Sequence, residues 1–304
     1  MRPKKIIRFI FIFVLVLNWT TLISMAQLKQ INQALQLGGF KVYKLQDGQT
    51  YLPLNTLSGI DPDEALKLSG GMDSVCIPIN SYLIKTPNHT ILVDAGAGEN
   101  TGEDTGHLIE QLKEIGIGVE QVDIILITHF HFDHIGGLTN SDGEPVFPNA
   151  TLYVPKAESD YWMRDLTMIP ENQQSRASKY KSIFSPYQSG NRYKVFLPDD
   201  ELLDGIKDLP AYGHTIGHTV YTITSNGEEL WCIGDLIHFE NIQFQYPQAS
   251  VSFDYDAQKA IGSRIDSFTR AANTNVIVAA SHLAKIIRLK TEKDRFEAIP
   301  IDLK

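Results

Sequence analysis

The chain has 304 residues, of which 43% are hydrophobic and 21% charged, a composition typical of a globular protein with one sizeable core. Its formal net charge of −9 argues against nucleic acid and anionic membrane surfaces as partners, because both require a basic face. Cys76 and Cys232 each lie in an apolar, strand-like run. We expect two buried thiols there, with a disulfide between them as the alternative.

The N-terminal segment has the pattern of a secretory signal peptide. Basic residues precede the short apolar run 9–17, and a small-residue cleavage site ends at Ala26. A retained membrane anchor is the alternative, although the apolar run is shorter than the roughly 20 residues that span a bilayer. We therefore expect residues 1–26 to be removed. Residues 27–304 would then form a secreted or periplasmic protein without stable membrane insertion.

Apolar runs rich in β-branched residues predict strands along most of the remaining chain. Residues 27–39 are expected to be a mobile or weakly helical lead-in, and Asp47-Gly48 indicates a turn after a strand that begins at Phe40. The polar segment 170–190 favours a helical insertion over a pocket. No linker divides the chain, so we expect one domain. The other expected strands cover 75–85, 90–93, 123–127, 151–154, 193–197, 206–209, 219–224, 230–233 and 276–280, and the expected helices cover 108–115, 156–165 and 254–272.

One stretch of seven residues, 128–134, contains three of the nine histidines and an aspartate. It directly follows the expected buried strand 123–127. Neighbours two apart in an extended backbone point the same way, so His129 and His131 can face one ion, while Asp133 and His134 can face a second. Imidazole and carboxylate are the donors that suit zinc and similar divalent metals. A loop with scattered surface histidines is the alternative.

Other residues with metal-binding side chains also stand at the ends of expected strands. Asp94 follows strand 90–93, Asp235 follows 230–233 and His282 follows 276–280. His214 and His218 belong to one glycine-bearing turn, 213–218. Taken alone, Asp94 would be read as a simple cap. Because side chains at the ends of core strands converge on rigidly held sites, the full set predicts one centre.

This order of residues resembles the metallo-β-lactamase superfamily along essentially the whole mature chain. Stretches such as 147–150 and 279–283 resemble its methyl parathion hydrolase branch. The resemblance implies an α/β (α+β) fold, an αββα four-layer sandwich. It also implies that His129, His131 and His214 hold one metal, that Asp133, His134 and His282 hold the other, that Asp235 bridges them, and that Asp94 orients the histidine loop while His218 supports the site from behind.

The implied function is a metal-dependent hydrolase that cleaves ester, lactone or phosphotriester bonds in a small molecule. Two divalent ions, with zinc as the first candidate, would ionise the attacking water. Asp133, Asp235 and His238 are the candidate catalytic side chains. His238 takes the position of a tyrosine in quorum-signal lactonases and is either a proton donor or a supporting histidine. Trp162 is either a pocket wall or a core residue.

The sequence is also compatible with several other functions. Within the enzymes, these are a quorum-signal lactonase and a β-lactamase. The loop that follows Asp94 lacks aromatic residues, which argues against organophosphates as native substrates. From another class, the chain could be a metal-binding or interaction module on the same fold. The resemblance also suggests a homodimer.

Overall fold

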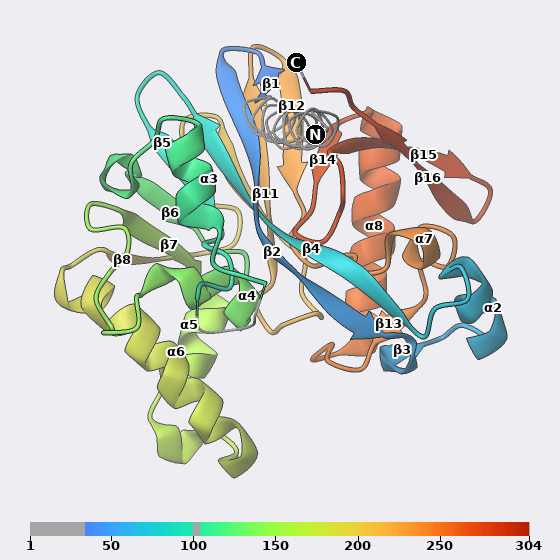
Figure 1. Cartoon of the computed structure of the whole chain (residues 1–304), viewed down its shortest axis with the longest axis horizontal. Coiled ribbons are helices and arrows are strands. Elements are labelled where there is room, and N and C mark those ends of the chain that lie inside the picture. Colours follow the sequence, from blue (N-terminus) through green and yellow to red (C-terminus); the bar gives the residue numbers. More distant parts are fainter. Residues whose placement is uncertain (1–33, 100–103, 304) are drawn as a thin grey trace, which may run out of the picture.

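The computed structural model describes residues 34–99 and 104–303. The expected signal peptide, 1–26, lies outside the described residues and stays a prediction. Two seven-stranded sheets pack against each other, and helices cover their outer faces (Figure 1). Within the described part of the chain, no helix has the length and apolar character needed to cross a bilayer.

The first sheet combines an antiparallel half with a parallel half. Strands β5, β6, β7 and β8 run parallel to one another, so they all end at the same edge of the sheet. The strand that precedes them in the sheet, β4, is antiparallel to β5. In spatial order this sheet contains β1 (Ala34–Leu37), β2 (Phe40–Pro53), β4 (Ser74–Lys85), β5 (Thr90–Val93), β6 (Ile124–Leu126), β7 (Thr151–Pro155) and β8 (Tyr193–Phe196).

The second sheet is mostly antiparallel, and β12 and β14 form its one parallel pair among the described strands. These two strands therefore also end at a common edge. In spatial order this sheet contains β16 (Arg295–Pro300), β15 (Ile287–Glu292), β14 (Ile277–Ala279), β12 (Glu228–Cys232), β11 (Thr219–Ser225), β10 (Ile206–Pro210) and β9 (Glu201–Leu203). A separate small pair joins β3 (Leu57–Ser58) to β13 (Ser250–Val251).

Three apolar layers hold the sandwich together. The middle layer lies between the sheets, where Ile84 and Leu126 of the first sheet share a cluster with Ile223 and Leu230 of the second. The outer face of the first sheet packs on α3 (Leu108–Glu114), α5 (Lys156–Trp162) and α6 (Glu171–Ser189), and that of the second packs on α8 (Ala257–Thr274). Burial of these faces is the main stabilising term. The expected αββα sandwich is confirmed. The short helices are α2 (Pro62–Leu68), α4 (Phe132–Ile135) and α7 (Glu240–Gln243).

The long helix α6 forms the helical insertion that the polar segment 170–190 predicted. It extends away from the sandwich on the side of α5 (Figure 1). Its buried face carries Ala177, Tyr180 and Phe184, which pack on the rest of the domain. The helix therefore forms one flank of the fold, beside the loop that carries the histidine motif.

Two local expectations at the start of the chain are wrong. Residues 34–37 form strand β1, which pairs with β2, where a lead-in without strand structure was expected. The Asp47-Gly48 pair lies within β2 as a bulge. Asp47 is buried, and its carboxylate accepts hydrogen bonds from the N–H groups of Ala97, Gly106 and Leu108. These distant donors decide the local structure, which a turn signal cannot anticipate.

The expectation of two buried thiols is half wrong. Cys232 is buried between the sheets, but Cys76 is exposed, and both are free. Cys76 lies near the start of β4, where that strand pairs only with β2 and its first residues are partly exposed. The strand pattern predicted the element correctly, but it could not show that this end of the strand extends beyond the apolar core.

Candidate metal centre

The topology of the two sheets brings the predicted site residues to one place. Asp94 follows β5, and the 129–134 motif follows its parallel neighbour β6. In the second sheet, Asp235 follows β12, and His282 follows the parallel neighbour β14. His214 lies on the connection between β10 and β11. Side chains that are far apart in the sequence therefore meet at the shared edge of the sandwich.

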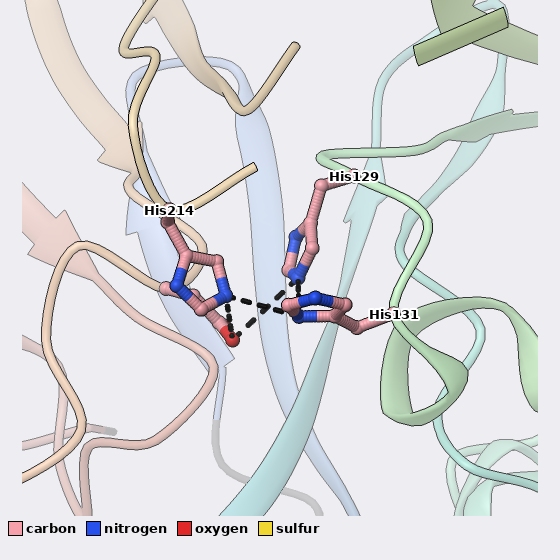
Figure 2. A group of neighbouring side chains, drawn as sticks. His129, His131 and His214 are labelled. Atoms are coloured by element: carbon pink, nitrogen blue, oxygen red, sulfur yellow. Dashed lines mark hydrogen bonds and ion pairs between the residues drawn. The ribbon is translucent and has the colours of Figure 1, made fainter. Parts of the chain in front are cut away.

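A first group of possible metal ligands consists of His129, His131, His214 and Asp235, whose donor atoms all lie within 4.8 Å of one another. The Nδ1 atom of His131 is 3.0 Å from Nε2 of His129 and 3.0 Å from Nε2 of His214. The Oδ2 atom of Asp235 is 3.2 Å from Nε2 of His214 and 3.6 Å from Nε2 of His129. Figure 2 shows the three imidazoles pointing toward one another from two separate loops.

A second group consists of Asp133, His134, Asp235 and His282, again within 4.8 Å of one another. The Nε2 atom of His134 is 3.1 Å from Oδ1 of Asp235 and 3.7 Å from Oδ2 of Asp133. The Nε2 atom of His282 is 3.2 Å from Oδ2 of Asp235 and 3.6 Å from Oδ2 of Asp133. Asp235 thus belongs to both groups and lies between them.

The outer nitrogens of four histidines are held by the surrounding protein. Nδ1 of His134 contacts Oδ2 of Asp94 at 2.7 Å, and Nδ1 of His214 contacts Oδ1 of Asp254 at 2.9 Å. Nδ1 of His282 contacts the Pro78 carbonyl oxygen at 2.8 Å, and Nδ1 of His129 contacts the Thr128 hydroxyl at 3.0 Å. If Nδ1 carries the proton in each ring, every Nε2 lone pair is directed into the centre.

These inner atoms fit a pair of divalent cations. Lone pairs of imidazoles and oxygens of carboxylates converge without donors between them, and such an arrangement needs positive charge to be stable. Nε2 of His134 and Oδ1 of Asp235 are both buried and face each other at 3.1 Å, and neither atom has a geometrically favourable hydrogen bond among the described residues. Nitrogen and oxygen donors of this kind suit zinc and related metals. The observed geometry therefore supports two cation sites that share Asp235.

The charges of the metal-free centre balance one another. Burial alone would raise the pKa of Asp235, but the neighbouring His134, His282 and His129 outweigh this and hold it well below its usual value. Burial likewise opposes protonation of His214, yet the hydrogen bonds to Asp235 and Asp254 raise its pKa to about 9. In the absence of metal, protons on such histidines would compensate the carboxylates. Cations that bind at neutral pH must displace those protons.

Two further predicted residues contact Asp235, His218 at its backbone and His238 at its carboxylate. His218 is buried and accepts a hydrogen bond at Nε2 from the Asp235 N–H, at 3.0 Å, while its Nδ1 contacts the Ala211 carbonyl at 3.1 Å. Burial, with His214 nearby, lowers the pKa of His218 to about 3, which keeps the ring neutral. The Nε2 atom of His238 is 3.2 Å from Oδ2 of Asp235, and its Nδ1 is buried without a hydrogen-bond partner in the described chain.

A cavity of about 640 Å³ opens onto this centre. Its wall is largely apolar, and α6 contributes Tyr180 and Arg176 to it. Trp162 does not line this cavity. It is 8% exposed and packs in the core, with its ring against that of Tyr180 at a centroid distance of 5.0 Å. The pocket role considered for Trp162 is therefore wrong, because Tyr180 lies on the cavity side. The apolar lining includes Tyr51, Leu52, Ile77, Ile79, Phe132 and Phe253.

Three residues that support the centre were not found from the sequence. Asp254 holds His214, and Glu158 accepts hydrogen bonds from both histidine loops. Asn80 of β4 binds the backbone on either side of His282, through the carbonyls of Ser281 and Leu283. None belongs to a motif, and their roles depend on which loops pack together. A signal for Asp254 was its place at the acidic start of an amphipathic helix, which suggested only a helix cap.

The comparison with protein families assigns this fold and site to a class. Residues 75–282 match the metallo-beta-lactamase superfamily, and the chain belongs to that superfamily. It is a metal-dependent hydrolase by this membership and by its relatives. One relative is an N-acyl homoserine lactonase from Bacillus sp, 26% identical over 245 residues, a match that covers 73% of this chain and 85% of the relative.

Solved structures agree with this class. The hydrolase AbOPH, of the beta lactamase superfamily, has a TM-score of 0.84 at 30% identity, and the match covers 90% of this chain and 98% of that one. AidC, a dizinc quorum-quenching lactonase solved with an acylated L-homoserine product, has a TM-score of 0.82 at 28% identity with the same coverage. AidC and the Bacillus relative are lactonases, and placement of this chain in a methyl parathion hydrolase branch stays a prediction.

Proposed function

We propose that this protein is a dinuclear metal hydrolase that opens the lactone ring of N-acylated homoserine lactones. The observation that carries the proposal is the pair of ligand groups joined at Asp235 on the floor of a largely apolar cavity. A polar reactive floor beneath an apolar wall suits a substrate with an ester carbonyl at one end and a hydrocarbon chain at the other. Relatives named as N-acyl homoserine lactonases support the same substrate class.

The ligand assignment follows the two groups. His129, His131 and His214 hold one ion, Asp133, His134 and His282 hold the other, and Asp235 is shared. Such ions, when bound, supply Lewis acidity and lower the pKa of water enough to give a nucleophile at neutral pH. The protein's part is to fix the donors in place. It does so through the contacts of Asp94, Asp254, Pro78 and Thr128 with the outer nitrogens.

The cavity wall positions the substrate relative to the floor. Phe253 lines the cavity and packs edge-on against the His238 ring at a centroid distance of 5.1 Å. Ile77 and Ile79 on β4 lie on the same cavity and offer apolar contacts. An acyl chain placed against these groups leaves water, which is favourable. With the acyl chain bound there, the carbonyl group of the lactone ring would lie over Asp235 and the histidines around it.

His238 serves as a positioning residue in this proposal. If its Nε2–H donates to Oδ2 of Asp235, the ring orients the shared carboxylate. Burial lowers the pKa of His238 to about 4, which favours the neutral form of the ring. This geometry favours the supporting role over that of proton donor to the leaving group.

Simple esters, phosphotriesters and β-lactams are the competing substrates. The test is a panel assay on the metal-reconstituted protein with acyl-homoserine lactones, aryl esters, methyl parathion and a cephalosporin. We expect the highest kcat/KM on an acyl-homoserine lactone, and its loss in Asp235→Ala. A matched control is His89→Ala, which changes an exposed histidine in the turn between β4 and β5. Higher kcat/KM on another class would reject the substrate, and no hydrolysis of any would favour a non-enzymatic module.

A further inference from the structure

A buried carboxylate outside the ligand groups connects the two loops that supply the first group. Glu158 lies on α5, is 0% exposed, and directs its carboxylate toward backbone of both loops. Oε2 accepts a hydrogen bond from the Phe130 N–H at 3.3 Å, and Oε1 accepts one from the Gly217 N–H at 2.7 Å. Phe130 lies between His129 and His131, and Gly217 follows His214 in the same turn.

The chemistry of these contacts explains why the residue is a glutamate. Burial of a carboxylate is costly, and it raises the pKa of Glu158. Among the described residues no lysine or arginine forms an ion pair with it. The two amides contact different oxygens of the carboxylate, and a glutamine would offer an acceptor at one of these positions and a donor at the other. The loss of one contact would leave a buried amide or carboxylate oxygen without its partner.

Helix α5 packs so closely against the turn that carries His214 and Gly217 that little space is left between them. A Cβ atom on Gly217 would lie 2.6 Å from the Glu158 backbone nitrogen, so the loop can reach the helix only with glycine there. The contact between Glu158 and Gly217 is thus part of the packing of the turn. The turn also carries His214, one of the three histidines of the first group.

We propose that Glu158 is a positioning residue that sets the spacing between the His129–His131 loop and the His214 turn, and thereby the affinity of the first group for its ion. This inference rests on the proposed metal centre. The second group has supports of its own, because Asp94 holds His134 and the Pro78 carbonyl holds His282. The effect of removing one acceptor should therefore fall on one ion of the two.

The experiment measures metal binding directly on the full chain. Glu158→Gln, wild type and a control variant are loaded with Zn²⁺ and titrated with a chromophoric chelator, and the Co²⁺-substituted forms are compared by visible absorption. The control is Ser159→Ala, which removes a hydroxyl from a buried residue on the same helix, where it accepts a hydrogen bond from the Tyr193 hydroxyl at 3.0 Å. Circular dichroism checks that each variant is folded.

We expect Glu158→Gln to bind one ion about 10–100-fold more weakly, with a changed Co²⁺ spectrum, while the second ion and Ser159→Ala match wild type. Wild-type affinity for both ions in Glu158→Gln would overturn the inference, and so would equal weakening of both. Absence of metal in the wild type would instead reject the proposed function. If the variant does not fold, amide exchange in metal-free wild type decides: we expect protected Phe130 and Gly217 amides, and free exchange of either would overturn the proposal.

Discussion

Asp94 and His134 form the shortest side-chain contact in the centre, with Oδ2 of Asp94 2.7 Å from Nδ1 of His134. The same carboxylate accepts hydrogen bonds from the Thr128 N–H and hydroxyl, both at 2.8 Å. Asp94 itself adopts a left-handed backbone conformation, with φ at 58°. One residue at the end of β5 thus fixes the start of the histidine loop and the orientation of one imidazole.

Asp94→Asn should weaken the second ligand group more than the first, because Asp94 contacts His134 directly and His129 only through Thr128. Asparagine tolerates the left-handed backbone, but its amide replaces one acceptor oxygen with a donor. We expect the ion held by Asp133, His134 and His282 to bind about 10–100-fold more weakly, as measured by chelator competition. Asp123→Asn is the control, since Asp123 also accepts a backbone N–H, that of Thr90 at 2.8 Å, at the opposite end of the strands. Equal affinities in Asp94→Asn and wild type would contradict the orienting role.

His131→Ala should abolish lactone hydrolysis while the protein stays folded. The residue lies on a loop at the rim of the sandwich, and its Nδ1 atom is 3.0 Å from both other histidines of its group. We expect one bound ion in place of two by elemental analysis and a loss of activity to background. The far-UV circular dichroism spectrum should not change. Full activity with one ion would rule out a dinuclear mechanism.

Phe253→Ala should change the preference for acyl-chain length. The ring is 37% exposed and lines the cavity beside His238. Removal of this apolar surface should lower kcat/KM for a dodecanoyl homoserine lactone about tenfold, which corresponds to about 1.4 kcal/mol. The butanoyl compound should lose much less. Tyr255→Ala is a neighbouring control, because Tyr255 packs on Tyr161. Equal losses for both lactones would show that the acyl chain does not contact Phe253.

Asp208→Asn should stabilise the protein at neutral pH but not in acid. Burial, together with Asp199 and Asp200, raises the pKa of Asp208 to about 6, above its ordinary value of 3.8. The folded state therefore holds this proton more tightly than the unfolded state, so ionisation costs stability as the pH rises through this range.

We expect the substitution to raise the free energy of unfolding by about 1–2 kcal/mol at pH 7.5, since solvent screens part of the charge. At pH 3.5, where Asp208 is protonated, the two proteins should have the same stability. Asparagine can still accept the hydrogen bond from the Asp199 N–H. Chemical denaturation at both pH values measures the difference, with the exposed Asp204→Asn as control. A stabilisation that is the same at both pH values would show that charge is not its cause.

The parts of the centre that are close together in the sequence could be predicted from it. The 129–134 motif spans one short loop and the start of α4, so the strand before it and the spacing of its side chains were enough to suggest two ions. Asp235 and His282 could also be found, because both directly follow short buried strands. Parallel pairing of β5 with β6 and of β12 with β14 then explains why these residues meet.

The supporting residues could not be predicted, because their partners are distant in the chain. Glu158 lies 28 residues from Phe130 and 59 from Gly217. The sequence around Asp47 predicted a turn. In the structure, the segments that contain Ala97 and Gly106 bring three backbone N–H groups to its carboxylate. The hairpin of β15 and β16 was also missed, although the alternation of buried Ile287 and Leu289 in β15 with more exposed neighbours is a strand signal.

The most direct test of the central claim is a metal titration of the metal-stripped protein, followed by elemental analysis and lactone hydrolysis on the same samples. We predict that the chain takes up two zinc ions and that hydrolysis requires both. Fewer than two tightly held ions in the active protein, or hydrolysis that persists in the metal-free form, would contradict a centre built from two ligand groups that share Asp235.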